Sequence, residues 1–220
     1  MKTLEPTSLI LIADAHLLPE ADSPEFFSIL ARLRALPRDR GVVFLGDVFD
    51  MWIALPGYET DAHRAFLAWC REERKRRTVV FLEGNHEFFV ARTHADAFTF
   101  AGDGAWRLGD FLATHGDLIN RRDWKYRLLR FGVRNGIART VLRLAGRLGI
   151  GPRVVRGIRE GLRGTNLRHK KDFPADLAKR WLLTLPPGSS VAAGHFPRAE
   201  RIQADGRVLE AIPACEPDGT

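Results

Sequence analysis

The sequence has few cysteines and no long apolar run. Its two cysteines, Cys70 and Cys215, show neither the spacing of a metal site nor the pattern of a disulfide framework. No apolar stretch approaches the roughly 20 residues needed to cross a bilayer. The first residues lead through a polar break into a short apolar run, which is not the pattern of a signal peptide. We therefore expect a protein of the reducing, cytoplasmic compartment.

The charge of the chain is unevenly distributed. At 220 residues, with 45% hydrophobic and 28% charged residues, the sequence is typical of a globular protein with one sizeable core. Residues 118–171 hold 16 lysines and arginines against two acids, Asp123 and Glu160, so this segment carries +14. The whole chain carries +7, which leaves −7 on the remainder. Such a basic segment suits contact with phosphate groups on nucleic acid, nucleotide or lipid.

Short apolar runs alternate with helical patterns in the first part of the chain. Buried strands are predicted at residues 8–13, 42–45 and 78–82, and helices at residues 24–36 and 60–75. This alternation indicates βαβ units and an α/β fold.

The second half is predicted to contain hairpins and a helical insert. The hairpins turn at Gly109-Asp110 and Asp205-Gly206, and residues 190–193 form a further strand. Between them, at about 118–175, apolar residues recur at three- and four-residue steps, with Arg139, Arg143 and Arg147 one turn apart on another face. We expect two or three short amphipathic helices here.

Side chains that can bind a metal follow five predicted strands: Asp14, His16, Asp47, Asn85, His115 and His195. The carboxyl ends of strands in an open α/β sheet form the crevice where ligands bind. Asp14 and His16, two residues apart on extended chain, point to the same side. Asp47 can bridge two ions about 3.5 Å apart. The mixture of oxygen and nitrogen favours Mn, Fe or Zn over Ca.

The motifs Asp-x-His, Gly-Asp, Gly-Asn-His-Glu, His-Gly-Asp and Gly-His occur in this order between residues 14 and 195. In order and spacing they resemble the calcineurin-like metallophosphoesterase family. The resemblance implies a β-sandwich flanked by helices, and two divalent ions that polarise the phosphoryl group, with Mn the expected metal. It assigns the first ion to Asp14, His16 and Asp47, and the second to Asp47, Asn85, His115 and His195. His86 would act near the leaving-group oxygen as a general acid or transition-state stabiliser.

One position departs from the family pattern. The family closes on Gly-His-x-His, whereas this sequence reads Gly194-His195-Phe196-Pro197. Proline offers no ligand, so the first ion is expected to be held more weakly. One hypothesis is therefore a metal-impaired family member that acts as a binding or scaffold protein.

The basic insert resembles that of the UDP-2,3-diacylglucosamine diphosphatases of lipid A biosynthesis. Asp123 and Tyr126 follow the His-Gly-Asp motif, and Asn166 is followed by Lys170. The resemblance implies that these four residues contact the substrate, whose pyrophosphate is cleaved to give acylated glucosamine 1-phosphate and UMP. It also implies a single domain, residues 1–220, whose helical cap covers the active site, with peripheral contact to the anionic inner membrane. A phosphodiesterase for another nucleotide, or for nucleic acid, is the alternative.

Overall fold

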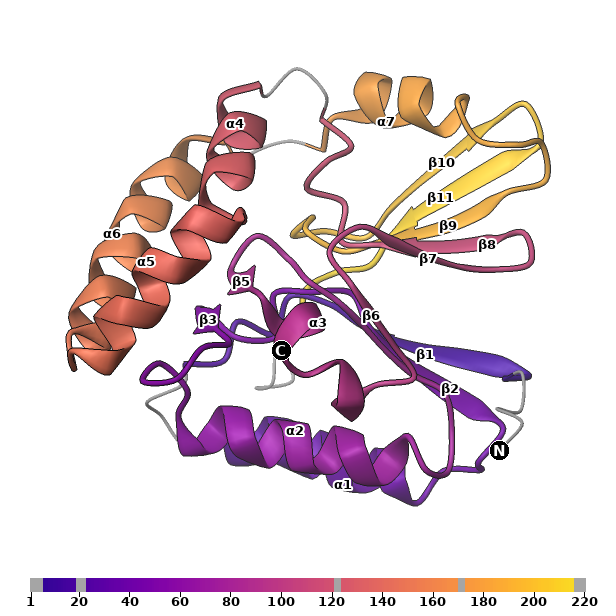
Figure 1. Ribbon diagram of the computed structural model, residues 1–220. Coiled ribbons are helices and arrows are strands. Elements are labelled where there is room, and N and C mark those ends of the chain that lie inside the picture. Colours follow the sequence, from indigo (N-terminus) through magenta and orange to yellow (C-terminus); the bar gives the residue numbers. More distant parts are fainter. Residues whose placement is uncertain (1–5, 19–22, 121–123, 170–172, 216–220) are drawn as a thin grey trace.

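Two β-sheets and the helices that flank them make up the body of the molecule (Figure 1). The computed structural model describes residues 6–18, 23–120, 124–169 and 173–215. Within these ranges, the side chains of residues 161–169 and of Lys125, Tyr126 and Leu129 are not described.

The first sheet is parallel and comes from the N-terminal half. Its strands, in the order β1-β2-β4-β6, are β1 (Ser8–Ile12), β2 (Arg40–Phe44), β4 (Val79–Leu82) and β6 (Phe100–Gly102). Two helices connect the first three strands: α1 (Pro24–Arg34) and α2 (Asp61–Glu73). The predicted βαβ units are therefore confirmed, with boundaries shifted by one or two residues.

The second sheet is mixed and comes from the C-terminal half. Its strands, in the order β10-β11-β9-β8-β7, are β10 (Glu200–Ala204), β11 (Arg207–Ala211), β9 (Ser190–Ala193), β8 (Phe111–Thr114) and β7 (Ala105–Leu108). Both predicted hairpins are present, as the antiparallel pairs β7–β8 and β10–β11. The strands β8, β9 and β11 run parallel to one another.

Alternating side chains place both faces of the central strands in apolar cores. On β2, Val42 and Phe44 pack with α1 and α2, whereas Val43 packs toward the second sheet. On β9, Val191 packs with helix α7 (Ala175–Leu182), whereas Ala192 packs toward the first sheet. The order of layers is therefore helices, sheet, sheet, helix, which explains why these strands read as continuous apolar runs.

A third group of elements lies beside the two sheets. It contains the short parallel pair β3 (Trp52–Ile53) and β5 (Glu87–Phe88), helix α3 (Val90–Thr93) and the 3-10 helix η1 (Ala95–Ala97). It also contains three consecutive helices, α4 (Trp124–Val133), α5 (Gly136–Arg147) and α6 (Gly151–His169). Two or three short helices were predicted in this region, and α6 is longer than expected at 19 residues.

The three helices rest on an apolar cluster formed around β3 and β5. Met51, Ile53 and Tyr58 belong to this cluster, and Leu142 of α5 and Val155 of α6 pack against it. The Tyr58 hydroxyl also donates a hydrogen bond to the Leu142 carbonyl, at 2.8 Å. In the part of the chain that the structure describes, none of the helices has the length and apolarity required to cross a membrane.

Candidate metal centre

The six predicted ligands come together where the two sheets meet. Asp14 and His16 follow β1, Asp47 follows β2, Asn85 follows β4, and His115 and His195 follow β8 and β9. Because β1, β2 and β4 are parallel, and β8 is parallel to β9, their carboxyl ends reach one edge of the molecule. Backbone hydrogen bonds join the first two loops, from Asp14 N to the Gly46 carbonyl and from His16 N to the Asp47 carbonyl.

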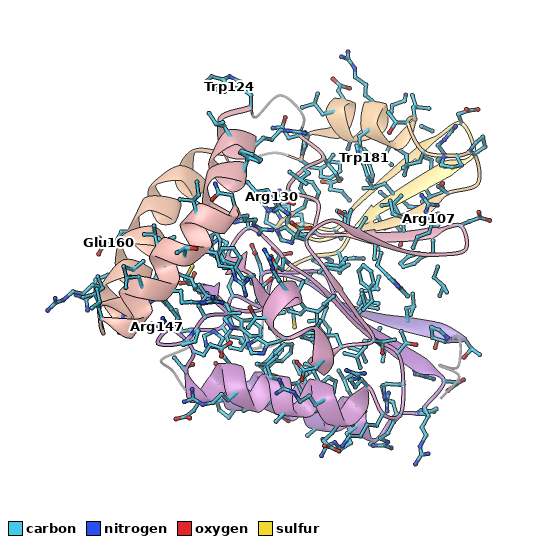
Figure 2. The ribbon with its side chains drawn as sticks, viewed as in Figure 1. Arg107, Trp124, Arg130, Arg147, Glu160 and Trp181 are labelled. Atoms are coloured by element: carbon cyan, nitrogen blue, oxygen red, sulfur yellow. The ribbon has the colours of Figure 1, made fainter. Side chains whose placement is uncertain are left out.

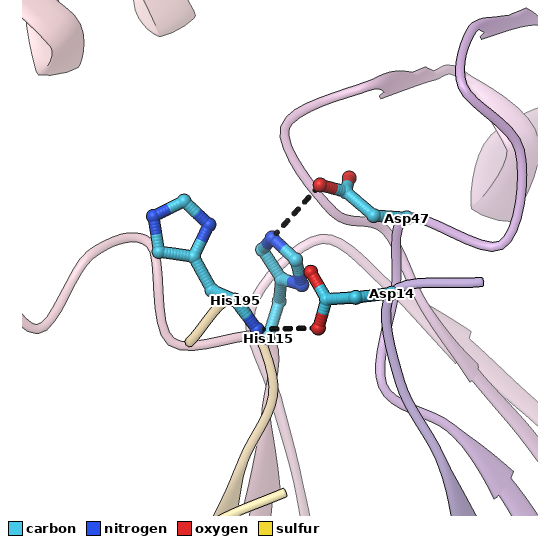
Figure 3. Close-up of side chains that lie close together, drawn as sticks. All are labelled: Asp14, Asp47, His115 and His195. Atoms are coloured by element: carbon cyan, nitrogen blue, oxygen red, sulfur yellow. Dashed lines mark hydrogen bonds and ion pairs between the residues drawn. The ribbon is translucent and has the colours of Figure 1, made fainter. Parts of the chain in front are cut away.

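Two overlapping groups of side chains have ligand atoms close enough to share an ion. The first consists of Asp14, Asp47, His115 and His195, and the second of His16, Asp47 and His86. Figure 3 shows the first group, with His115 directed at Asp47 and the backbone N–H of His195 donating to Asp14 Oδ2 at 2.6 Å. Asp47 belongs to both groups, as a bridging carboxylate must.

Asp47 lies at the centre of the constellation. Its Oδ1 accepts a hydrogen bond from His86 N at 2.9 Å. Its Oδ2 has no hydrogen-bond partner among the described residues, and it faces Nε2 of His115 at 3.6 Å, of His86 at 3.9 Å and of His16 at 4.0 Å. These separations are too long for hydrogen bonds. They are within the roughly 4.2 Å that can separate two ligands each about 2.1 Å from one ion.

Two histidines are oriented by backbone carbonyls. His115 Nδ1 lies 2.8 Å from the Leu45 carbonyl, and His86 Nδ1 lies 2.5 Å from the Asp50 carbonyl. A carbonyl only accepts, so each Nδ1 carries the proton and donates it. In a neutral ring this leaves the Nε2 lone pair directed into the site, which is the arrangement that metal-binding histidines adopt.

The electrostatics of the site favour a positive charge between the carboxylates. Burial alone would raise the pKa of Asp47, but the charges of His115, His86 and His16 together bring it well below the ordinary value. Burial lowers the pKa of His115, yet Asp47, Asp14 and Asp117 raise it to a net value above the ordinary one. A proton on the histidine can supply this charge, and so can a metal ion that replaces the proton.

The backbone of the site adopts conformations that are costly for most residues. Among the described residues, six other than glycine have a positive φ, and four of these are candidate ligands: Asp14 (51°), His16 (45°), Asp47 (52°) and His195 (69°). Such conformations cost on the order of 1–3 kcal/mol each and concentrate at functional sites. The clustering of strain on these four residues therefore points to function.

Gly84 allows the loop after β4 to approach Asp47. A Cβ atom at Gly84 would lie 2.5 Å from Asp47 N and 2.7 Å from Asp47 Cγ, and closer still to Oδ1. Any side chain at this position would therefore displace the central carboxylate.

Glu87 holds two of the ligand-bearing loops together, a role that sequence analysis missed. Its buried carboxylate accepts hydrogen bonds from the N–H groups of Asp47, Val48 and Gly84, at 3.0, 2.8 and 2.9 Å. Burial, and then the charge of Asp47, raise the pKa of Glu87, although these hydrogen bonds oppose the rise. The Gly-Asn-His-Glu motif contained the signal, because a carboxylate followed the histidine.

Two arginines, one on α4 and one directly after it, also contact the ligand-bearing loops. Arg134, which directly follows α4, pairs with Glu83 at 3.3 Å and donates to the carbonyl of Glu87 at 2.8 Å. Arg130 pairs with Asp117 at 2.5 Å. The basic segment as a whole was expected to suit contact with phosphate groups, whereas these two arginines of the segment face inward, because buried carboxylates require a partner.

The other predicted positions have different outcomes. Asp123 and Lys170 lie outside the described residues, while Tyr126 and Asn166 fall in α4 and α6 with side chains that are not described. Pro197 is exposed to solvent, and the adjoining Phe196 is buried.

The chemistry of the clusters fits a divalent metal with mixed oxygen and nitrogen ligands. The uncompensated Asp47 oxygen and the oriented imidazoles carry this conclusion. Asn85 adds a neutral oxygen, since its Oδ1 lies 3.1 Å from His115 Nε2.

Comparison with known proteins agrees with this geometry. Residues 7–197 match the calcineurin-like phosphoesterase family, a range that contains every residue of both clusters. A search of the curated proteins found no match.

Proposed function

The chain belongs to the calcineurin-like phosphoesterase family and is a phosphoester hydrolase, and on this premise we propose that it cleaves the pyrophosphate of UDP-2,3-diacylglucosamine. The observation that supports hydrolysis is the shared Asp47 oxygen, which faces three imidazoles and has no hydrogen-bond partner among the described residues. The choice of a lipid nucleotide rests on the resemblance of the insert and on a neighbouring cavity.

In the proposed centre, Asp14, His16 and Asp47 hold one ion, and Asp47, Asn85, His115 and His195 hold a second. We infer manganese for both, with iron or zinc able to replace it. When bound, such ions polarise the phosphoryl oxygens and lower the pKa of a bound water to about 7.

His86 is proposed to act at the leaving-group oxygen. The Asp50 carbonyl holds its Nδ1–H, so Nε2 faces the cluster. In the doubly protonated imidazolium Nε2 also carries a proton, which it can donate to the departing oxygen to leave a neutral ring. Arg159 of α6 pairs with the Asp50 carboxylate at 2.9 Å and supports this loop. Because Pro197 supplies no ligand, we expect Asp14, His16 and Asp47 to hold the first ion more weakly than the second ion is held.

A cavity of about 490 Å³ supports an amphiphilic substrate. Met51, Tyr58 and Val155 form an apolar part of its wall, and Arg156 and Arg159 add positive charge. A wall of this kind suits an acyl chain next to an anionic group. In this proposal, α4–α6 form the basic helical cap of a single domain that spans residues 1–220, and Asp123, Tyr126, Asn166 and Lys170 contact the substrate.

The second candidate is phosphodiester hydrolysis of another nucleotide or of nucleic acid. The charge of +14 on residues 118–171 favours it. Binding to nucleic acid would fall steeply with salt and would be indifferent to detergent, whereas a lipid substrate has the opposite preference.

A substrate panel with added manganese tests the proposal. We expect release of UMP from the lipid nucleotide at a higher kcat/KM than cleavage of an aryl phosphodiester or of single-stranded nucleic acid. His115→Ala should abolish turnover, and His94→Ala, a matched change at a histidine paired with Glu59, should retain it. If nucleic acid were cleaved at a higher kcat/KM than the lipid nucleotide, the proposed lipid substrate would be wrong and the second candidate function would take its place.

Metal content measured on His86→Ala tests the role of that residue separately. We expect manganese bound as in the wild type and a lowered kcat, since a proton donor is lost while the ligands remain. Loss of one equivalent of metal would instead make His86 a ligand.

A further inference from the structure

The helices α4 and α5 expose an unusual number of apolar side chains. Of the eleven exposed large hydrophobic residues in the described part of the chain, eight lie between residues 124 and 150. Seven of these are 57–78% exposed, and we call them the outer stripe: Trp124, Leu128, Phe131, Ile137, Val141, Leu144 and Leu148.

The outer stripe follows helical spacing. On α5, Ile137, Val141 and Leu144 recur at steps of four and three residues, so they line one face of the helix. Trp124, Leu128 and Phe131 have the same spacing on α4. The apolar face of each helix therefore points to solvent, the reverse of the usual arrangement in a globular protein.

The opposite side of α5 is already packed, so the stripe cannot turn inward. Leu142 packs on the cluster around Tyr58, and its carbonyl accepts a hydrogen bond from the Tyr58 hydroxyl. A Cβ atom at Gly146 would lie 2.8 Å from the Tyr58 ring, which shows how closely the helix is seated. The inner side of α4 is held by an ion pair of Arg130 with Asp117, and Arg134, directly after the helix, pairs with Glu83.

Positive charge accompanies the stripe. Arg127 and Arg147 are exposed on the same two helices, and Arg153 is exposed on α6. Figure 2 shows Trp124 at the outer end of α4, Arg147 at the far end of α5, and Arg130 on the side toward the sheets. An apolar stripe with basic residues around it is the pattern of a helix that lies in the interface of a bilayer.

We propose that the outer stripe of α4 and α5 docks on a membrane surface that contains anionic lipid. The apolar side chains would enter the boundary between headgroups and acyl chains, and the arginines would contact lipid phosphates. Trp124 suits such a boundary, because tryptophan concentrates at membrane interfaces.

Charge distinguishes this partner from a second copy of the chain. A symmetric dimer through the stripe would bring two segments of +14 together, and like charges disfavour that contact. A nucleic acid would satisfy the arginines but would leave the apolar stripe in water. The proposal concerns the outer face alone and does not depend on which phosphoester is cleaved.

Sedimentation with lipid vesicles tests the proposal. The full chain should bind vesicles of phosphatidylcholine mixed with phosphatidylglycerol, and bind pure phosphatidylcholine much more weakly. The double variant Ile137→Ser, Leu144→Ser should lose about tenfold or more in partitioning, since two apolar side chains that would enter the bilayer are removed. Leu18→Ser, Leu183→Ser is the matched control, because both leucines are 45% exposed and lie elsewhere.

Fluorescence quenching by brominated lipid gives a second measurement. Trp124 should be quenched in anionic vesicles, and Trp124→Phe should lose most of that response. Turnover of a soluble aryl phosphodiester should stay at the wild-type rate in every variant, which separates this test from that of the proposed activity. Equal vesicle binding by both double variants, or a dimer abolished by the Ile137→Ser, Leu144→Ser changes, would overturn the proposal.

Discussion

Replacing Gly84 with alanine should impair the metal centre through one added methyl group. The new Cβ would lie 2.7 Å from Asp47 Cγ, whereas two carbon atoms in contact are separated by about 3.5–4.0 Å. Asp47 would therefore have to move by about 1 Å. Gly84 does not lie in the left-handed region of backbone conformation, so the alanine adds no dihedral strain and its effect is purely steric.

The expected loss follows from this displacement. Misplacing a catalytic group by about 1 Å can reduce the rate about 10²-fold, which corresponds to about 2.7 kcal/mol of transition-state stabilisation. The cost in stability should be about 1–3 kcal/mol, as for other overpacked sites. The affinity for manganese should fall as well, because Asp47 belongs to both ligand clusters.

The assay compares kcat/KM on an aryl phosphodiester with added manganese, together with manganese titration and thermal melting. Gly104→Ala is the matched control, since a Cβ atom there would meet nothing within 4 Å. If Gly84→Ala retained a kcat/KM within about twofold of the wild type, the tight fit around Asp47 would not matter for catalysis.

Three further predictions concern strain, metal and pH. His195→Gly should be more stable than His195→Ala by about 0.5–1 kcal/mol, because relief of the positive φ of 69° is partly offset by the greater freedom of glycine in the unfolded chain; equal urea midpoints would remove the argument from strain. Manganese at about 100 times its Kd should raise the free energy of unfolding by about 2.7 kcal/mol, and Asp47→Asn should lose most of this gain in a thermal shift assay. Burial raises the pKa of Glu59, but the hydrogen bond and charge of His94 lower it to a net value below the ordinary 4.5. This pair therefore stabilises the fold above about pH 4.5 and loses its effect as the pH falls through the lowered pKa, so Glu59→Gln should show a flatter decline of Tm on acidification.

The parallel sheet and the candidate ligands could be predicted because their signals are local. Apolar runs such as Val42 and Val43 before Gly46-Asp47 place a strand and then a polar loop, and parallel strands deliver such loops to one edge. The ligand set rested on five short motifs in order, and the structure brings its members other than Asn85 into two clusters, one of which also contains His86.

Other features depended on contacts that no local pattern encodes. Glu87 bonds to Asp47 and Val48, about 40 residues earlier, and Arg134 reaches back to Glu83. The sequence showed an arginine-rich amphipathic segment but not which face turns inward. The packing of Leu142 against Tyr58 determines which face of α5 turns inward, and Ile137 and Leu144 on the other face remain exposed to solvent.

The sequence by itself thus determined the α/β fold, the residue types of the candidate metal centre and the family to which the chain belongs. Strand periodicity and short motifs each span only a few neighbouring residues, so they can be recognised in the sequence alone. Only the tertiary structure decided that Asp47 bridges two clusters, that four candidate ligands sit in strained backbone, and that α4 and α5 expose their apolar face. These properties arise from distances between residues remote in the chain, which only the folded arrangement of the two sheets and three helices defines.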